Sequence, residues 1–231
     1  MPRIEAPFDL VIFDCDGVLI DSEMIACRVE VEALAALGCV ITLDRYMECC
    51  IGRAHRDARA ELERELGRAL PAEFTADAAL RVASAFARDL RAMAGVERVL
   101  ATLPLSKCVA SSSRPERLAH TLGLTGLAAW FGGAVFSTAM VARGKPAPDI
   151  YLHAAAQMGH APARCLVIED SAPGIIGAKA AGMTVFGFTG GSHCRDGHGA
   201  RLAAAGADLV FADMRELPAL IAQRKATLTT S

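Results

Sequence analysis

The chain lacks long hydrophobic runs and dense runs of basic residues. Hydrophobic residues make up 53% of its 231 positions, yet no segment approaches the roughly 18 consecutive apolar residues that suggest a membrane-spanning helix. Lysine and arginine are spread along a chain of formal net charge −2. The concentrated positive charge typical of nucleic-acid binding is therefore missing. These absences argue against a membrane or a nucleic acid as partner and favour a small molecule.

The chain also lacks a CxxC pair and a secretory signal. Its eight cysteines show no regular spacing, and several lie inside apolar stretches. This pattern predicts reduced, buried thiols rather than a disulfide framework. The first residues, MPRIEAPFD, contain no apolar segment of the kind that directs export. We expect a cytoplasmic protein, and we expect a monomer although no sequence feature sets the oligomeric state.

What the chain does contain is a series of short apolar segments rich in Val, Ile and Phe. They lie at 9–14, 107–113, 134–140, 164–170, 184–190 and 208–214. Most lack clean alternation of polar and apolar residues, as expected of parallel strands covered on both faces. Helical patterns separate the later segments, at 114–124, 148–159, 171–182 and 214–225. Strands that alternate with helices predict an α/β fold, a Rossmann-like doubly wound parallel sheet.

The first apolar segment breaks this alternation. No second strand is expected until about residue 107, and residues 24–93 show helical patterns separated by glycine and proline. We therefore predict a discontinuous catalytic core, 1–20 and 94–231, with an inserted all-helical cap at 21–93. Sheets of this kind bind ligands at the carboxyl ends of their strands, so an insertion there would cover the site.

Two carboxylates stand at the end of the first predicted strand, in FDCDGVLIDSE (13–23). Residues two apart in a strand project to the same side, so Asp14 and Asp16 should leave the sheet close together. Like charges that close repel, and they need a cation, a shared proton or wide solvation. Alone, Asp16-Gly17 could equally be an ordinary turn.

Three further strand ends carry polar residues. They are Ser111–Ser113 in VASSS, Lys145 in RGKPAPD, and Glu169 and Asp170 in VIEDSAPG. Singly, each could be a helix cap or an exposed side chain, but all are expected on one rim of one sheet. Carboxylates suit Mg²⁺, which usually binds through one or two of them plus a substrate phosphate. Hydroxyl and ammonium groups suit the remaining phosphate oxygens, so this rim predicts a site for phosphoryl transfer.

These four stretches resemble, in order, the four motifs of the haloacid dehalogenase superfamily of phosphohydrolases. The helical insertion lies where that family's smaller cap belongs. The resemblance covers nearly the whole core and is strongest to the branch that contains phosphoglycolate phosphatases, sugar-phosphate phosphatases and β-phosphoglucomutase.

The resemblance implies a nucleophilic Asp14, which would form an aspartyl-phosphate, and an Asp16 that acts as general acid and then base. Mg²⁺ would be held by Asp14, the backbone carbonyl of Asp16, Asp170, and Glu169 directly or through water. The residues expected to bind the phosphoryl group are Ser111, Ser112 and Lys145. The dehalogenases of the superfamily lack the second aspartate, so the presence of Asp16 disfavours carbon–halogen cleavage.

Three alternatives to a phosphatase exist on the same fold. A β-phosphoglucomutase carries a histidine in its first cap helix, where this chain has Ala26, and a cap arginine where this chain has His55. Both departures favour hydrolysis. A catalytically silent binding module is disfavoured because every motif residue is present. A Schiff-base lysine in the cap, as in phosphonoacetaldehyde hydrolase, is excluded because residues 24–93 contain no lysine.

The substrate is expected to be a small phosphorylated metabolite, a sugar or sugar-acid phosphate. Candidates for its recognition in the cap are Arg53, His55 and Arg56, since a cap loop that closes on the site can read the substrate.

Two groups of residues are expected to lie outside the chemistry. Asp21 and Glu23 should belong to the hinge and first turn of the cap. The segment GGSHCRDGHG (190–199) contains ligand types for zinc, but their spacing matches no standard site. We expect it to border the active-site rim.

Overall fold

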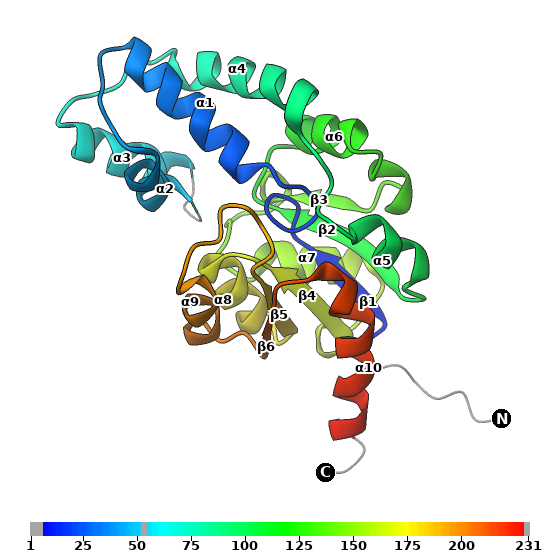
Figure 1. Cartoon of the computed structure of the whole chain (residues 1–231). Helices are drawn as coiled ribbons and strands as arrows, with labels where there is room; N and C mark the ends of the chain where they lie inside the picture. The colour runs from blue at the N-terminus through cyan, green and yellow to red at the C-terminus, as the bar shows by residue number, and fades with distance from the viewer. Residues whose placement is uncertain (1–6, 52–54, 229–231) are drawn as a thin grey trace.

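A computed structural model of the chain describes residues 7–51 and 55–228. Its centre is a six-stranded, all-parallel sheet in the order β3-β2-β1-β4-β5-β6 (Figure 1). The strands are β1 (Leu10–Phe13), β2 (Ser106–Ser111), β3 (Val135–Ser137), β4 (Cys165–Glu169), β5 (Thr184–Phe188) and β6 (Leu209–Phe211). All six predicted strands are present, and their order is that of a doubly wound sheet.

Helices cover both faces of the sheet. They are α5 (Val96–Thr102), α6 (Pro115–Leu124), α7 (Asp149–Met158), α8 (Ala172–Ala180), α9 (His198–Ala204) and α10 (Leu217–Leu228). Leu10 and Ile12 of β1 join the hydrophobic cluster under α7, α8 and α9, whereas Val11 and Phe13 join the cluster under α5, α6 and α10. Burial on both sides explains the continuous apolar runs in the sequence.

Short 3₁₀ turns link several of these elements. They are η1 (Ala128–Trp130), η2 (Thr138–Met140), η3 (Pro162–Arg164) and η4 (Met214–Glu216). The strand expected at 134–140 is shorter than predicted because η2 replaces its last part. The Ser137 hydroxyl oxygen accepts a hydrogen bond from the Ala139 N–H at 3.1 Å, which caps this turn and ends the strand.

The four helices α1 (Glu23–Ala36), α2 (Leu43–Cys50), α3 (His55–Leu66) and α4 (Phe74–Asp89) lie between β1 and α5 in the chain. In Figure 1 they lie above the carboxyl ends of the strands. α1 packs against α4, and α2 packs against α3. A separate hydrophobic cluster that includes Met24, Leu34, Tyr46 and Leu62 holds them together. This arrangement is the helical cap expected from the sequence.

Two chain segments connect the cap to the core, and they lie side by side. Ile20 forms an antiparallel bridge with Ala92. The N–H of Met93 donates to the Leu19 carbonyl at 2.8 Å, and the N–H of Asp21 donates to the Arg91 carbonyl at 3.1 Å. The cap is thus joined to the core through one pair of hydrogen-bonded segments, which we call the hinge.

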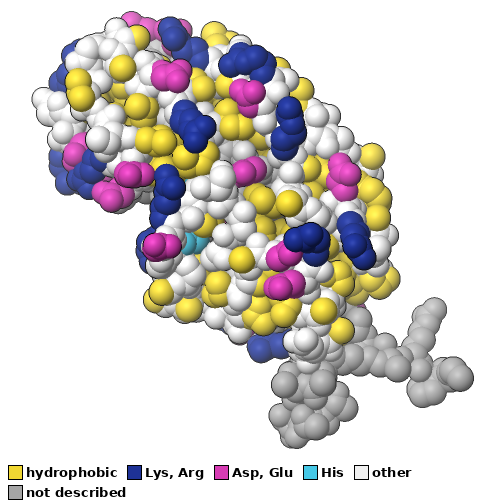
Figure 2. All heavy atoms as spheres, viewed as in Figure 1, with side chains coloured by type: hydrophobic (Ala, Val, Ile, Leu, Met, Phe, Trp, Pro, Cys, Tyr) yellow, Lys and Arg dark blue, Asp and Glu magenta, His cyan; other side chains and the backbone are white. Residues whose placement is uncertain are grey.

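One face of the molecule carries mixed charge. On the face drawn in Figure 2, the coloured Lys and Arg side chains are interspersed with Asp and Glu rather than gathered into one basic area. Among the described helices, none is both long and apolar enough to cross a bilayer.

Candidate active site

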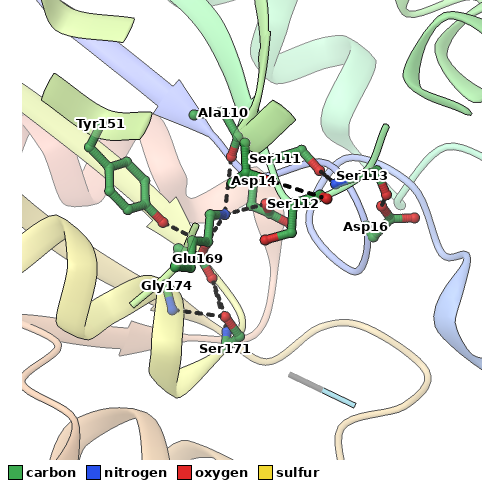
Figure 3. Close-up of polar contacts among 12 residues, drawn as sticks. Asp14, Asp16, Ala110, Ser111, Ser112, Ser113, Tyr151, Glu169, Ser171 and Gly174 are labelled. Carbon is green, nitrogen blue, oxygen red and sulfur yellow. Dashed lines mark hydrogen bonds and ion pairs between the residues drawn. The ribbon is translucent and has the colours of Figure 1, made fainter. Parts of the chain in front are cut away.

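The polar residues that follow the strands meet at the carboxyl edge of the sheet. Asp14 follows β1, which lies between β2 and β4. Ser111 ends β2, Glu169 ends β4, and Asp170 comes next. Figure 3 shows Asp14, Ser111 and Glu169 converging from these neighbouring strands. The parallel topology therefore brings together side chains that are up to 156 positions apart in the sequence.

A buried lysine joins two of these carboxylates. The Lys145 ammonium lies 2.6 Å from Asp14 Oδ1 and 2.5 Å from Glu169 Oε1, and it donates to the Ala110 carbonyl at 3.1 Å. Burial alone would lower the pKa of Lys145, but Asp14 and Glu169 raise it well above its usual value. Lys145 is therefore a fixed positive charge at the floor of the site.

Asp14 remains electrostatically crowded in spite of this lysine. Burial raises the pKa of its carboxyl group well above the usual range; Lys145 opposes the shift, and the charges of Glu169 and Asp170 add to it. Burial also raises the pKa of Asp170. Lys145 offsets only part of the negative charge of Asp14, Glu169 and Asp170. These three carboxyl groups would therefore be stabilised by a further cation.

Glu169 is fully engaged by protein groups. Its Oε1 also accepts a hydrogen bond from the Tyr151 hydroxyl at 2.8 Å, and its Oε2 accepts from the N–H and the hydroxyl of Ser171 at 3.1 and 2.9 Å. Gly174 leaves the room for this carboxyl group, because a Cβ there would overlap it. These contacts, drawn in Figure 3, make Glu169 an anchor for Lys145 and for the start of α8.

Asp16 has a separate set of partners. Its Oδ1 accepts from the Ser22 hydroxyl at 2.6 Å and from Arg117 at 2.8 Å, and its Oδ2 accepts from the Ser113 hydroxyl at 2.6 Å. Burial would raise the pKa of Asp16, but Arg117 and the two serines lower it below its ordinary value.

The largest negative contributions at Asp14 come from the end of β4. Sequence spacing pairs Asp14 with Asp16, whereas the negative charges that crowd Asp14 are those of Glu169 and Asp170. The reason is that Asp16 finds its own cation, Arg117. The need for a further cation remains, but it arises between the ends of β1 and β4.

The two expected phosphate-binding serines differ in exposure. Ser111 is 1% exposed, and its hydroxyl oxygen accepts from the Ser113 N–H at 3.1 Å. Ser112 is exposed and lines the cavity beside Lys145. An anion in the cavity would therefore meet Ser112 directly and Ser111 deeper in the wall.

A cavity of about 1180 Å³ lies between this rim and the cap. Asp14, Asp16 and Lys145 line it from the core, and Ala26 and Tyr46 line it from the cap. Typical small-molecule sites enclose roughly 300–1,000 Å³. The space is ample for a small phosphorylated metabolite.

Three residues expected to face the substrate cannot be placed. Arg53 and the side chains of His55 and Arg56 lie outside the described residues, although the backbone of His55 and Arg56 begins α3.

The hinge acids Asp21 and Glu23 differ from each other. Asp21 Oδ1 accepts hydrogen bonds from the N–H and hydroxyl of Ser192, at 3.1 and 2.7 Å, so it ties the hinge to the loop after β5. Glu23 begins α1 and lines the cavity. Burial, with the nearby charge of Asp16, raises the pKa of Glu23 to about 7. That Glu23 stays outside the chemistry remains a prediction.

The loop after β5 borders the cavity, as expected. His193, Arg195 and His198 are among its lining residues. His193 Nε2 lies 3.1 Å from Asp170 Oδ2. Burial alone would lower the pKa of His193, but the bond to Asp170 and the neighbouring Cys194 raise it to about 11.

Sequence reasoning missed Arg117 and Tyr151. Arg117 lies in the first turn of α6, where the helix dipole disfavours a positive charge. A basic residue in the first turn of a predicted helix is a signal that sequence analysis could use, because its positive charge calls for an acidic side chain nearby. Tyr151 gave no such signal, since it lies among the apolar residues of the inner face of α7.

The turn after Asp16 supplies a test of how tightly the site is built. Gly17 has φ +79°, and a Cβ there would overlap Asp170 and His193; Gly126 has a similar φ of +72° but open space around it. Gly126→Ala should lower the free energy of unfolding by about 1–2 kcal/mol, because alanine is strained in the left-handed conformation. Gly17→Ala should have this same loss and a further loss of about 1–3 kcal/mol, because its Cβ also overlaps its neighbours. Urea denaturation of both variants measures the difference, and equal losses would contradict the overlap.

Comparison with known proteins agrees with this geometry. Residues 8–182 match the family model described as haloacid dehalogenase-like hydrolase. The 6-phosphogluconate phosphatase of Escherichia coli is 31% identical over 200 residues, 86% of each chain. Hexitol phosphatase B of the same species is 30% identical, over 74% of this chain and 79% of that one.

A solved structure is similar over nearly its whole length. A conserved haloacid dehalogenase-like protein of unknown function from Agrobacterium tumefaciens superposes with a TM-score of 0.85 at 41% identity, covering 94% of this chain and 99% of that one. With the four strand-end motifs gathered at one rim beneath a helical cap, the chain belongs to the haloacid dehalogenase-like hydrolase family.

Proposed function

We propose that the protein is a Mg²⁺-dependent phosphatase that hydrolyses a small phosphorylated metabolite, a sugar or sugar-acid phosphate, through an aspartyl-phosphate on Asp14. The observation that carries the proposal is the buried contact of Asp14 with Lys145 at the floor of the cavity, with Asp16 beside it. The two phosphatases named above support the reaction class and the kind of substrate.

The donor set suits a magnesium ion. Asp14 and Asp170 are buried oxygen donors whose pKa values are raised by burial. We propose that Asp14, Asp170 and the backbone carbonyl of Asp16 hold the metal. The resemblance implies support from Glu169 directly or through water. Because Lys145, Tyr151 and Ser171 bind both of its carboxylate oxygens, we propose that Glu169 acts through Lys145 and Asp14. When bound, Mg²⁺ neutralises charge and orients the phosphoryl group.

The first half of the reaction is attack by Asp14. Its carboxylate oxygen forms a bond to phosphorus while the bond from phosphorus to the substrate oxygen breaks. Asp16 gives a proton to that oxygen, which leaves as an alcohol. Lys145, Ser111 and Ser112 position the phosphoryl oxygens and offset their charge.

In the second half, Asp16 takes a proton from water, and the resulting hydroxide attacks phosphorus to release phosphate and regenerate Asp14. Arg117, Ser22 and Ser113 hold Asp16 in the ionised form that this step needs. The first half needs the protonated form, which requires that these contacts weaken.

The cap is proposed to select the substrate. We place its boundaries at 20/21 and 93/94, beside the paired segments that connect it to the core. Arg53, His55 and Arg56 are proposed to read the substrate. We further propose that the protein is a monomer and that it is cytoplasmic. The reducing cytoplasm suits the buried free thiols of Cys15, Cys108 and Cys165.

The test is phosphate release from a panel that includes 6-phosphogluconate, hexitol phosphates and β-glucose 1-phosphate, with Mg²⁺ or with a chelator. We expect release from at least one compound, dependent on Mg²⁺ and absent in Asp14→Asn. If the wild type releases nothing above that variant across the panel, the proposed phosphatase activity is wrong. Conversion of β-glucose 1-phosphate to the 6-phosphate without release would instead identify a mutase.

A further inference from the structure

Two histidines that follow β5, His193 in the loop and His198 at the first position of α9, contact the same aspartate. His193 Nε2 lies 3.1 Å from the carboxylate oxygen Oδ2 of Asp170. His198 Nε2 lies 2.7 Å from the backbone carbonyl oxygen of Asp170. One residue is thus held at its side chain and at its main chain by two groups only five positions apart.

The place of His193 is built into the fold. Its side chain is 2% exposed. A Cβ at Gly17 would lie 2.8 Å from the ring carbon Cε1, and a Cβ at Gly191 would lie 2.7 Å from Nδ1. The imidazole therefore fits between two glycines, one from the turn after Asp16 and one from its own loop. Larger residues at either position would displace the ring from Asp170.

The orientation of His198 is also fixed. Its Nδ1 accepts a hydrogen bond from Arg201 at 3.0 Å, so its Nε2 carries the proton that is donated to the Asp170 carbonyl. Ser192, in the same loop, is bound to Asp21 at the hinge. The loop is thus anchored on both sides of His193.

A zinc site at this loop is the competing explanation. The ligand atoms of His193, Cys194 and His198 lie within 4.8 Å of one another. However, both ring nitrogens of His198 are engaged, and His193 directs Nε2 at Asp170, which leaves only the buried Nδ1 of His193 without a partner. A metal here would have to displace these contacts, so the geometry favours a role toward Asp170.

We infer that His193 and His198 are positioning residues that fix Asp170 for metal binding. The hydrogen bond to Oδ2 restricts the rotation of the carboxylate, and we assign the other oxygen, Oδ1, to the cation. The bond to the carbonyl fixes the main chain where β4 turns into α8. This inference rests on the proposed role of Asp170 as a magnesium ligand.

The experiment measures Mn²⁺ binding to the purified full chain by electron paramagnetic resonance, which requires no catalysis. Groups that orient metal ligands typically contribute 10–100-fold to metal affinity. We expect His193→Ala to weaken Mn²⁺ binding by about 10-fold or more. His193→Gln, whose amide can place an N–H near the position of Nε2, should restore most of the loss. His198→Ala should weaken binding by a smaller factor, and the exposed His120→Ala should leave it unchanged.

Thermal melting followed by circular dichroism shows whether each variant folds. If His193→Ala does not fold, the inference is tested by His198→Ala, which should bind Mn²⁺ more weakly than the wild type, and by His193→Gln, which should bind it nearly as well. If His193→Ala binds Mn²⁺ within twofold of the wild type, or more tightly, the inference is overturned while the proposed function stands. A wild type that binds no Mn²⁺ would overturn both. Stoichiometric zinc in the purified protein that is lost in Cys194→Ser would show that the loop is itself a metal site.

Discussion

Replacement of Asp14 by Asn is expected to abolish phosphate release without weakening the fold. The amide cannot form the acyl phosphate, and loss of a nucleophile commonly costs on the order of 10⁴-fold or more in rate. The fold should not suffer, because burial and the charges of Glu169 and Asp170 disfavour the ionised carboxylate at this position. Lys145 keeps Glu169 as a partner in the variant.

The sign of the pH dependence follows from the raised pKa of Asp14. A carboxyl group whose pKa is higher in the folded state destabilises the fold at neutral pH, and this loss fades as pH falls and the group is protonated. The variant should therefore equal or exceed the wild type in urea denaturation at pH 7, with a smaller advantage at pH 5.

The matched control is Asp9→Asn, which removes an exposed carboxylate paired with Arg164 just before β1, at the end of the strand away from Asp14. It should retain activity. If Asp14→Asn keeps more than about 1% of the wild-type rate, covalent catalysis by Asp14 is wrong.

The core residues of the site that the sequence predicts share one property: they lie at the ends of strands or after them. In a parallel sheet, the residue after each strand arrives at the same edge whatever the sequence separation, so Asp14, Lys145 and Asp170 can be brought together from pattern alone. The positions of Arg117 and His193 follow no such rule. Arg117 depends on how α6 is rotated about its axis, and His193 depends on the path of a loop shaped by Gly17 and Gly191.

The helices that the patterns miss are short. α5 and α9 have seven residues each, too few for a helical period to stand out. Within the predicted helical cap, the eight residues of α2 likewise show no period of their own. α2 is capped by Thr42, whose hydroxyl oxygen accepts from the Arg45 N–H at 3.3 Å. α9 follows directly on the glycine-rich segment after β5, whose composition indicates a loop. Their stability comes from packing against longer elements, which a local pattern does not contain.

Replacement of Lys145 by Met should have the largest effect on stability. The methionine fills much of the same volume but leaves Asp14 and Glu169 buried without their cation, at 10% and 0% side-chain exposure. Removing one partner of a buried ion pair typically costs about 3–5 kcal/mol. Phosphate release should also fall by about 10²–10³-fold, since a preorganised donor to the phosphoryl group is lost.

The loss of stability should depend on pH. Lys145 opposes the raised pKa of Asp14, so without it the pKa of Asp14 in the folded state rises further. The variant then takes up protons on folding and its stability falls as pH increases. The deficit relative to the wild type should shrink from pH 7 to pH 5 as Asp14 becomes neutral. Urea denaturation at several pH values measures this trend.

Lys179→Met is the matched control, because Lys179 on α8 pairs with Asp208 at 38% and 20% side-chain exposure. An exposed pair contributes about 0–1 kcal/mol, so this variant should remain near the wild type. Equal destabilisation of the two variants would mean that loss of any lysine side chain, rather than of the buried charge, weakens the fold. A deficit for Lys145→Met that stays constant from pH 7 to pH 5 would contradict the view that Lys145 stabilises the fold by compensating buried carboxylates.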